Sequence, residues 1–123
     1  CVVVIAEGPP VVSDRSHPAW KLYDEAMRLK EPGRHVFTAA DIAQWLFDAG
    51  CTEVITRERF TENNSCRAWL AASGCDAATQ ASILAMHVHY SRVAHRAYNA
   101  TITDDGDFLM RWRHCIVAGY KPL

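Results

Sequence analysis

Three histidines lie close together in one stretch of the chain and could in principle bind a metal ion. His87 and His89 are separated by one residue, and His95 follows eight positions after His87. The stretch is predicted to be helical, and residues two apart on a helix point about 200° apart. His87 and His89 therefore cannot reach one ion as neighbouring helical ligands. We expect structural or surface histidines here and no metal site.

The five cysteines show no spacing typical of a metal site or a disulfide framework. They are odd in number and scattered, with no Cys-x-x-Cys pair. We therefore expect reduced thiols in a cytoplasmic protein. Cys1 could act as an N-terminal nucleophile, but it leads into an apolar run that would bury it, and burial raises the pKa of a thiol. The five are Cys1, Cys51, Cys66, Cys75 and Cys115.

Charge and hydropathy exclude several functional classes. The 123 residues carry 13 basic and 14 acidic side chains, so the basic surface of a sequence-independent nucleic-acid binder is not expected. No apolar stretch approaches the roughly 20 residues that span a bilayer, and the apolar start lacks the charged flank of a signal peptide. No repeat or low-complexity linker marks a boundary, so residues 1–123 are predicted to form a single domain.

The chain begins with a predicted strand. Residues 1–6 are apolar without interruption, which is typical of an interior parallel strand with both faces covered and both edges paired. Glu7-Gly8-Pro9-Pro10 ends this strand, because proline lacks the donor that a sheet needs. No earlier segment of the chain supplies a neighbour. We therefore expect another polypeptide to complete the sheet.

The remaining elements are predicted in α/β order. A helix over about 19–30 is followed by one that Thr38 and Asp41 cap and Gly50 ends, and then by a strand over 51–60. Strand, helix and strand make a crossover unit. Two further helices, one of them over 77–98, precede a β-hairpin in which residues 101–103 and 108–121 flank an Asp-Gly turn.

Residues 35–54 resemble a segment in the latter half of class I S-adenosylmethionine-dependent methyltransferases. The part from Thr38 to Gly50 is similar to that family's helix ending in Ala-Gly before an aromatic residue, with Cys51 in the aromatic position. Residues 117–122 are similar to the family's reversed last strand, which finishes in a small residue followed by lysine. The resemblance implies the C-terminal half of a Rossmann-like α/β fold, with residues 8–37 as a lid over the substrate.

The resemblance also implies a cofactor and a partner. The family binds S-adenosylmethionine through a glycine-rich loop and acidic residues in its N-terminal half, and no Gly-x-Gly occurs in this chain. The chain alone should not bind the cofactor. We expect a partner polypeptide carrying the N-terminal half, either from a split enzyme or from one enzyme cut before its fifth strand. The methyl acceptor should be a small molecule, with neither nucleic acid nor membrane as partner.

The resemblance points to five site residues. Glu7 should lie at the cleft, because ligands gather at the carboxyl ends of parallel strands. Trp20, Tyr23 and Met27 would line the acceptor site, and His35 is suited to be a base near neutral pH.

Each of these roles has an alternative. Glu7 could be a solvated strand end, the lid side chains could simply pack their helix, and the base could lie on the missing half. The arginines are expected on solvated faces or interfaces, although an acidic substrate pocket stays open: Arg57, Arg59, Arg92, Arg96, Arg111 and Arg113.

Two other functions stay open at this point. The chain could be a non-catalytic scaffold or regulatory subunit that retains half of a methyltransferase fold and stabilises a partner. It could also be an independent small α/β domain that binds a ligand by itself.

Overall fold

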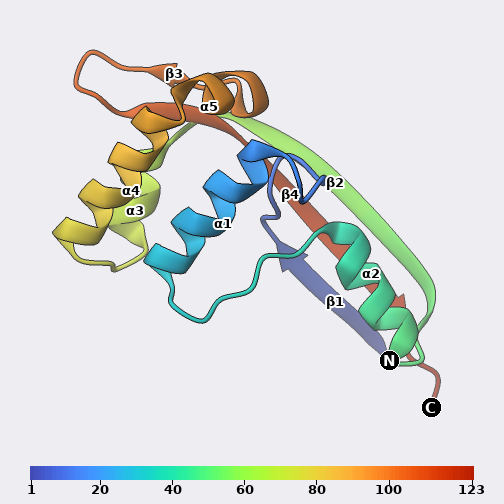
Figure 1. Ribbon diagram of the computed structural model, residues 1–123. Helices are drawn as coiled ribbons and strands as arrows, with labels where there is room; N and C mark the ends of the chain where they lie inside the picture. The colour runs from blue at the N-terminus through green and yellow to red at the C-terminus, as the bar shows by residue number, and fades with distance from the viewer. The chain divides into compact units, whose positions relative to one another are not determined.

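The computed structural model describes residues 1–93 and 95–123, which form an α/β fold with an open antiparallel sheet (Figure 1). In chain order the elements are β1 (Val2–Glu7), α1 (Pro18–Lys30), α2 (Ala39–Asp48), β2 (Thr52–Ser65), α3 (Cys66–Ala72), α4 (Ala77–His89), α5 (Ser91–Tyr98), β3 (Thr101–Ile102) and β4 (Phe108–Tyr120). The predicted order is confirmed. Two bounds differ, since the strand predicted over 51–60 continues to Ser65 and the helix predicted over 77–98 is divided at Tyr90.

Strand β4 lies between β1 and β2. It pairs antiparallel with β1, from Val2 opposite Tyr120 to Glu7 opposite Cys115. The start of β2 contacts the end of β4, where Thr52 Oγ1 lies 3.4 Å from the Tyr120 carbonyl oxygen. Near the other end of β2, Asn64 Nδ2 donates to the Met110 carbonyl at 3.0 Å. β1 and β2 therefore run in the same direction, with the reversed final strand between them.

The prediction that β1 is a parallel strand is wrong at the edge that pairs within the described residues, and pairing at its other edge stays a prediction. There, β1 pairs with β4 alone, and that pairing is antiparallel. Val3 and Ile5 pack against a core, so the alternation of a strand turns Val2 and Val4 to the other face, where they are 67% and 60% exposed. Cys1, expected to be buried, is exposed as well.

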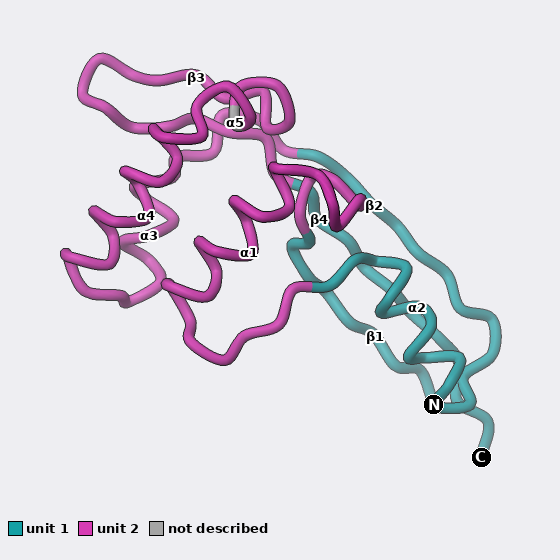
Figure 2. The backbone as a smooth tube through the Cα atoms, in the orientation of Figure 1, with its two compact units in different colours: residues 1–9, 37–60, 113–123 teal, residues 10–36, 61–112 magenta. Residues whose placement is uncertain are grey.

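The chain forms two compact units, each assembled from separate segments (Figure 2). Unit 1 comprises residues 1–9, 37–60 and 113–123, and unit 2 comprises residues 10–36 and 61–112. Unit 1 thus contains β1 and α2, whereas unit 2 contains α1, α3, α4, α5 and β3. Both β2 and β4 contribute to each unit.

The core of unit 1 forms between α2 and its strands. Ile42 and Leu46 of α2 are buried with Cys51, Cys115 and Val117. The predicted capping box of α2 is confirmed: the Asp41 backbone donates to Thr38 Oγ1 at 3.1 Å, and the Thr38 backbone donates to Asp41 Oδ2 at 2.9 Å. This cap fixes where α2 begins.

The core of unit 2 gathers side chains from its helices around the first half of β4. Leu22, Ile83, Phe108 and Met110 are among its buried members, and the Tyr98 hydroxyl donates to the Ala19 carbonyl at 3.0 Å. Even positions of β4 are buried in this unit, whereas odd positions such as Cys115 and Val117 are buried in unit 1. The buried positions of β4 therefore change from even to odd along the strand.

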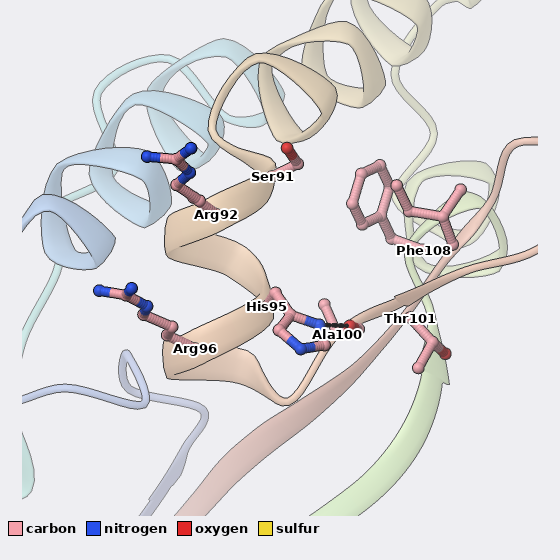
Figure 3. A pocket seen from close by; sticks show the side chains of 8 residues that line it. Ser91, Arg92, His95, Arg96, Ala100, Thr101 and Phe108 are labelled. Atoms are coloured by element: carbon pink, nitrogen blue, oxygen red, sulfur yellow. Dashed lines mark hydrogen bonds between the residues drawn. The ribbon is translucent and has the colours of Figure 1, made fainter.

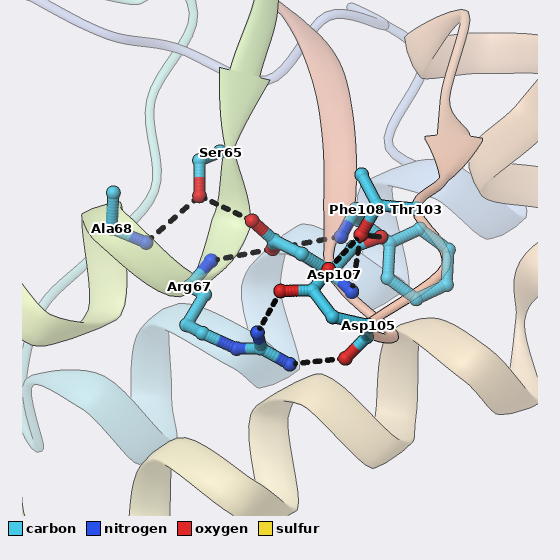
Figure 4. Close-up of polar contacts among 7 residues, drawn as sticks. All are labelled: Ser65, Arg67, Ala68, Thr103, Asp105, Asp107 and Phe108. Carbon is cyan, nitrogen blue, oxygen red and sulfur yellow. Dashed lines mark hydrogen bonds and ion pairs between the residues drawn. The ribbon is translucent and has the colours of Figure 1, made fainter.

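A polar cluster joins the β3–β4 turn to the start of α3 within unit 2 (Figure 4). The Asp107 carboxylate accepts hydrogen bonds from Ser65 Oγ at 2.5 Å, from the Arg67 backbone at 2.9 Å and from the Phe108 backbone at 2.8 Å. Arg67 also reaches the side chain and carbonyl of Asp105, both at 2.9 Å. The predicted Asp-Gly turn is present, with Gly106 at φ 83°.

None of the helices in residues 1–93 and 95–123 has the length and apolarity that crossing a bilayer requires.

Candidate functional site

Helix α1 carries three of the five predicted site residues. It begins at Pro18, whose missing donor costs nothing in a first turn, and His17 Nδ1 accepts from the Ala19 backbone at 3.0 Å as its cap. Trp20, Tyr23 and Met27 follow at helical spacing on this rigid element. The structure therefore places all three in unit 2.

Two of these three side chains are buried. Trp20 and Met27 are 6% and 4% exposed, and the Arg15 guanidinium lies 4.8 Å from the centroid of the Trp20 ring. Their burial agrees with the alternative that they pack the helix. Tyr23 is only half-buried, and it lies near Tyr98, whose pKa is raised by burial and by that neighbour. Tyr23 is therefore the α1 candidate with a surface that a ligand could reach.

The loop after α1 is organised by an acidic residue between two basic ones. Glu31 accepts from Lys30 Nζ at 2.7 Å and from Arg34 Nη1 at 2.8 Å, and these bonds lower the Glu31 pKa to about 2. Lys30 Nζ also lies 5.1 Å from the Trp69 ring centroid. His35 comes directly after this cluster and is exposed. Its ring is thus open to solvent at the edge of an anchored loop.

Glu7 belongs to unit 1, whereas the other four candidates belong to unit 2. It ends β1 opposite Cys115 and is half-buried. Burial raises the pKa of the Cys115 thiol, and the carboxylate of Glu58 raises it further. Cys115 is therefore a neutral thiol at neutral pH, and Glu7 is the group at this strand end that could bind a ligand.

A shallow pocket of about 640 Å³ lies in unit 2 beside α5, and sequence reasoning did not identify it. His95, Ala100 and Phe108 line it together with Arg92 and Arg96. Figure 3 shows both guanidinium groups pointing away from His95 and Phe108, so neither arginine reaches toward these two side chains. The sequence gives no motif for such a pocket, because Phe108 reaches it only through the hairpin that follows α5.

The histidines considered as metal ligands have structural partners instead. His87 is buried with Nδ1 2.8 Å from the Ile83 carbonyl, and burial lowers its pKa. His95 Nδ1 lies 2.7 Å from the Ala100 carbonyl, and the His89 ring contacts Tyr90 edge to face. Within the described ranges, no group of three or more His, Cys, Asp or Glu side chains could hold a metal ion.

Comparisons with known proteins show the fold. No family model matches the chain, and no curated protein matches it significantly. A protein from Bacillus halodurans C-125 assigned as a methyltransferase matches over 99% of this chain and 56% of its own, with TM-score 0.72 and 10% identity. The YcgJ protein from Bacillus subtilis matches over 99% of this chain and 52% of its own, with TM-score 0.64 and 13% identity. The chain therefore spans about half the length of the solved structures that it matches.

Proposed function

We propose that this chain is the substrate-side half of a small-molecule S-adenosylmethionine-dependent methyltransferase of Rossmann-like fold. One observation carries the proposal: 99% of the chain superposes on about half of a protein assigned as a methyltransferase. The N-terminal half, with the cofactor site, would come from a further segment of polypeptide, because no Gly-x-Gly loop occurs in these residues. The enzyme would be active only when both halves are together.

The chemistry assigns separate tasks to the lid and the strand end. Methyl transfer is an in-line displacement, so the acceptor must be aligned with the sulfonium methyl that S-adenosylmethionine supplies when bound. Tyr23, half-buried on α1, would contact the acceptor, and Trp20 and Met27 would hold that helix in place. His35, exposed after the Glu31 cluster, would accept the proton of a hydroxyl or acidic carbon. In unit 1, Glu7 would offer its carboxylate to a polar ligand group at the end of β1.

A non-catalytic scaffold is the second candidate, and the burial of Trp20 and Met27 favours it. Both residues resemble packing groups more than the lining of an open acceptor site. On this hypothesis the chain would stabilise a catalytic partner without contacting its substrate.

A labelled methyl-transfer assay separates the two candidates. The chain is tagged at Leu123, which is fully exposed, and purified under native conditions with whatever polypeptide completes it. The assembly is incubated with methyl-labelled S-adenosylmethionine and the low-mass fraction of an extract of its own cells. Label should enter a small molecule, and His35→Gln should slow the transfer by about 100-fold, as expected for loss of a general base.

The matched control is His89→Gln, at an exposed histidine on α4. It should leave the transfer rate unchanged. Equal rates for the His35 variant, the control and the wild type would remove His35 from the mechanism. No transfer by an intact assembly would favour the scaffold.

A further inference from the structure

Two arginines of α5 line the pocket beside that helix without a partner of opposite charge. Arg92 and Arg96 are exposed, and in the described part of the chain neither guanidinium group forms an ion pair or a hydrogen bond. Arg111, by contrast, pairs with Glu62 at 2.6 Å. The structure therefore brings two arginines with free guanidinium groups to one cavity.

The spacing of Arg92 and Arg96 places two like charges on one face of α5. Residues four apart on a helix are neighbours on the same side, and two positive charges at this spacing destabilise the helix. An anion bound between them would remove that repulsion. Figure 3 shows both guanidinium groups extending to the same side of α5. The pair is therefore placed to bind one anion, and the guanidinium fork matches the oxygens of a carboxylate or a phosphate.

The side of the pocket away from the two guanidinium groups carries apolar side chains. Ile102 lies opposite Phe108 in the pairing of β3 with β4, so both side chains point to the same face of this hairpin. Both residues line the pocket, and Ile102 is 57% exposed. An exposed apolar side chain in a cavity offers surface to the hydrocarbon part of a ligand.

Local structure holds this side of the pocket in shape. Asn99 ends α5 in the left-handed conformation, with φ 48°, and thereby turns the chain into β3. His95 Nδ1 lies 2.7 Å from the Ala100 carbonyl oxygen, and because a carbonyl only accepts, Nδ1 carries a proton. This bond fixes the His95 ring beside β3. The cavity is therefore preformed, as small-molecule sites usually are.

The lining has the composition of a site for an organic anion. The described residues that line the pocket include two arginines and one histidine and no acidic residue. The whole chain has 13 basic and 14 acidic side chains, so this local excess of positive charge does not reflect a basic protein. The volume of about 640 Å³ lies within the roughly 300–1,000 Å³ of small-molecule sites.

We propose that this pocket binds a small organic anion with a hydrocarbon body. Its carboxylate or phosphate group lies between Arg92 and Arg96, and its hydrocarbon part lies across α5 against Ile102. Every lining residue lies between positions 91 and 108, within unit 2. None of these residues has a task in the proposed methyl transfer, so the two proposals can fail separately.

Calorimetric titration with defined probes tests the site. The native assembly, purified through a tag at Leu123, is titrated with octanoate, octyl phosphate, acetate and octanol, all below micelle-forming concentrations. Octanoate or octyl phosphate should bind roughly tenfold more tightly than acetate, which lacks the hydrocarbon body, and than octanol, which lacks the charge. The tighter of the two anions identifies the head group. If neither binds, or if octanol or acetate binds equally well, the proposal is wrong.

Paired variants assign the binding to this pocket. Arg92→Gln combined with Arg96→Gln should weaken binding of the anion roughly tenfold. The matched control is Arg57→Gln combined with Arg59→Gln, which removes the same charge at two exposed arginines of β2. The control should bind the anion as the wild type does. Equal affinities of the two double variants would overturn the assignment.

A second pair of variants tests the apolar side. Ile102→Asn should weaken octanoate binding roughly fivefold, because apolar contact area is lost. Ile55→Asn, at an isoleucine of similar exposure, 53%, on β2, should leave it unchanged. Circular dichroism verifies that each variant is folded. Equal octanoate affinity of the two variants would contradict the placement of the hydrocarbon body against Ile102.

Discussion

The carboxylate of Asp107 connects two segments of unit 2 that are distant in sequence. It accepts from the side chain of Ser65 and from the backbones of Arg67 and Phe108, and it is only 8% exposed. Ser65 in turn caps α3, because its hydroxyl accepts from the Ala68 backbone at 3.0 Å. A single side chain thus fixes the hairpin turn against the first turn of α3.

Replacing Asp107 with alanine should lower the free energy of unfolding by about 1–3 kcal/mol, since buried donors lose their acceptor. Urea unfolding followed by circular dichroism measures the change. Asp104→Ala, at an exposed position in the same turn, should change stability by less than about 0.5 kcal/mol. Similar losses for both variants would show that Asp107 has no special role in this cluster.

The burial of His87 makes the stability of the protein depend on pH. Burial lowers its pKa from the ordinary value of 6.5, so the folded protein keeps the ring neutral where the unfolded chain binds a proton. The contribution of His87 to the free energy of unfolding should therefore be complete above pH 6.5. It should decrease as the pH drops below 6.5, with a slope of at most about 1.4 kcal/mol per pH unit.

His87→Leu should remove that contribution. Unfolding curves of the wild type and the variant are compared at pH 8, 6.5 and 5.5. The difference in stability between the two proteins should be constant above the ordinary pKa and shift in favour of the variant toward pH 5.5. A difference that does not change with pH would contradict the assignment.

At the scale of elements, Gly119 shows why the last strand needs a small residue near its end. A Cβ built there would lie 3.0 Å from Cys51 Cβ and 3.3 Å from Val54 Cγ2, closer than side chains normally pack. Gly119→Ala should therefore cost about 1–3 kcal/mol of stability by overpacking the unit 1 core.

The matched control is Gly8→Ala, where the new Cβ would meet only the Arg113 carbonyl oxygen at 3.7 Å, an ordinary contact. Its effect on chemical denaturation should be small. If Gly119→Ala were as stable as this control, the core around Leu46 and Cys51 would be looser than the structure indicates.

Local signals in the sequence predicted most elements because those signals are strong. Proline and glycine mark the ends of β1 and α1, Thr38 and Asp41 cap α2, and Gly106 sets the hairpin turn. The division at Tyr90 was missed because neither proline nor glycine marks it. The extension of β2 to Ser65 was missed because its later residues are polar, and its pairing is seen in the contact of Asn64 with Met110.

The candidate site was less predictable than the fold. Helical spacing placed Trp20, Tyr23 and Met27 together on α1 but could not separate buried members from an open one, because burial depends on which helices pack around it. The Asp107 cluster was missed entirely. Its partners lie about 40 residues away in sequence, at Ser65 and Arg67, and no short motif joins them.

At the scale of the whole molecule, the chain matches only part of each solved structure that it resembles. The chain covers 56% and 52% of the two solved structures that it matches. In the described residues, β1 pairs with β4, and Val2, Val4, Ile116 and Tyr120 are exposed. Under the proposed function, the cofactor site would lie in a further segment of polypeptide.

Calorimetric titration with S-adenosylmethionine tests this account most directly. The isolated chain and the native assembly are titrated under the same conditions, with S-adenosylhomocysteine as a competing ligand. We predict about one equivalent of binding by the assembly and none by the isolated chain, because the latter has no Gly-x-Gly loop. Cofactor binding by the isolated chain, or no binding by the intact assembly, would contradict the account.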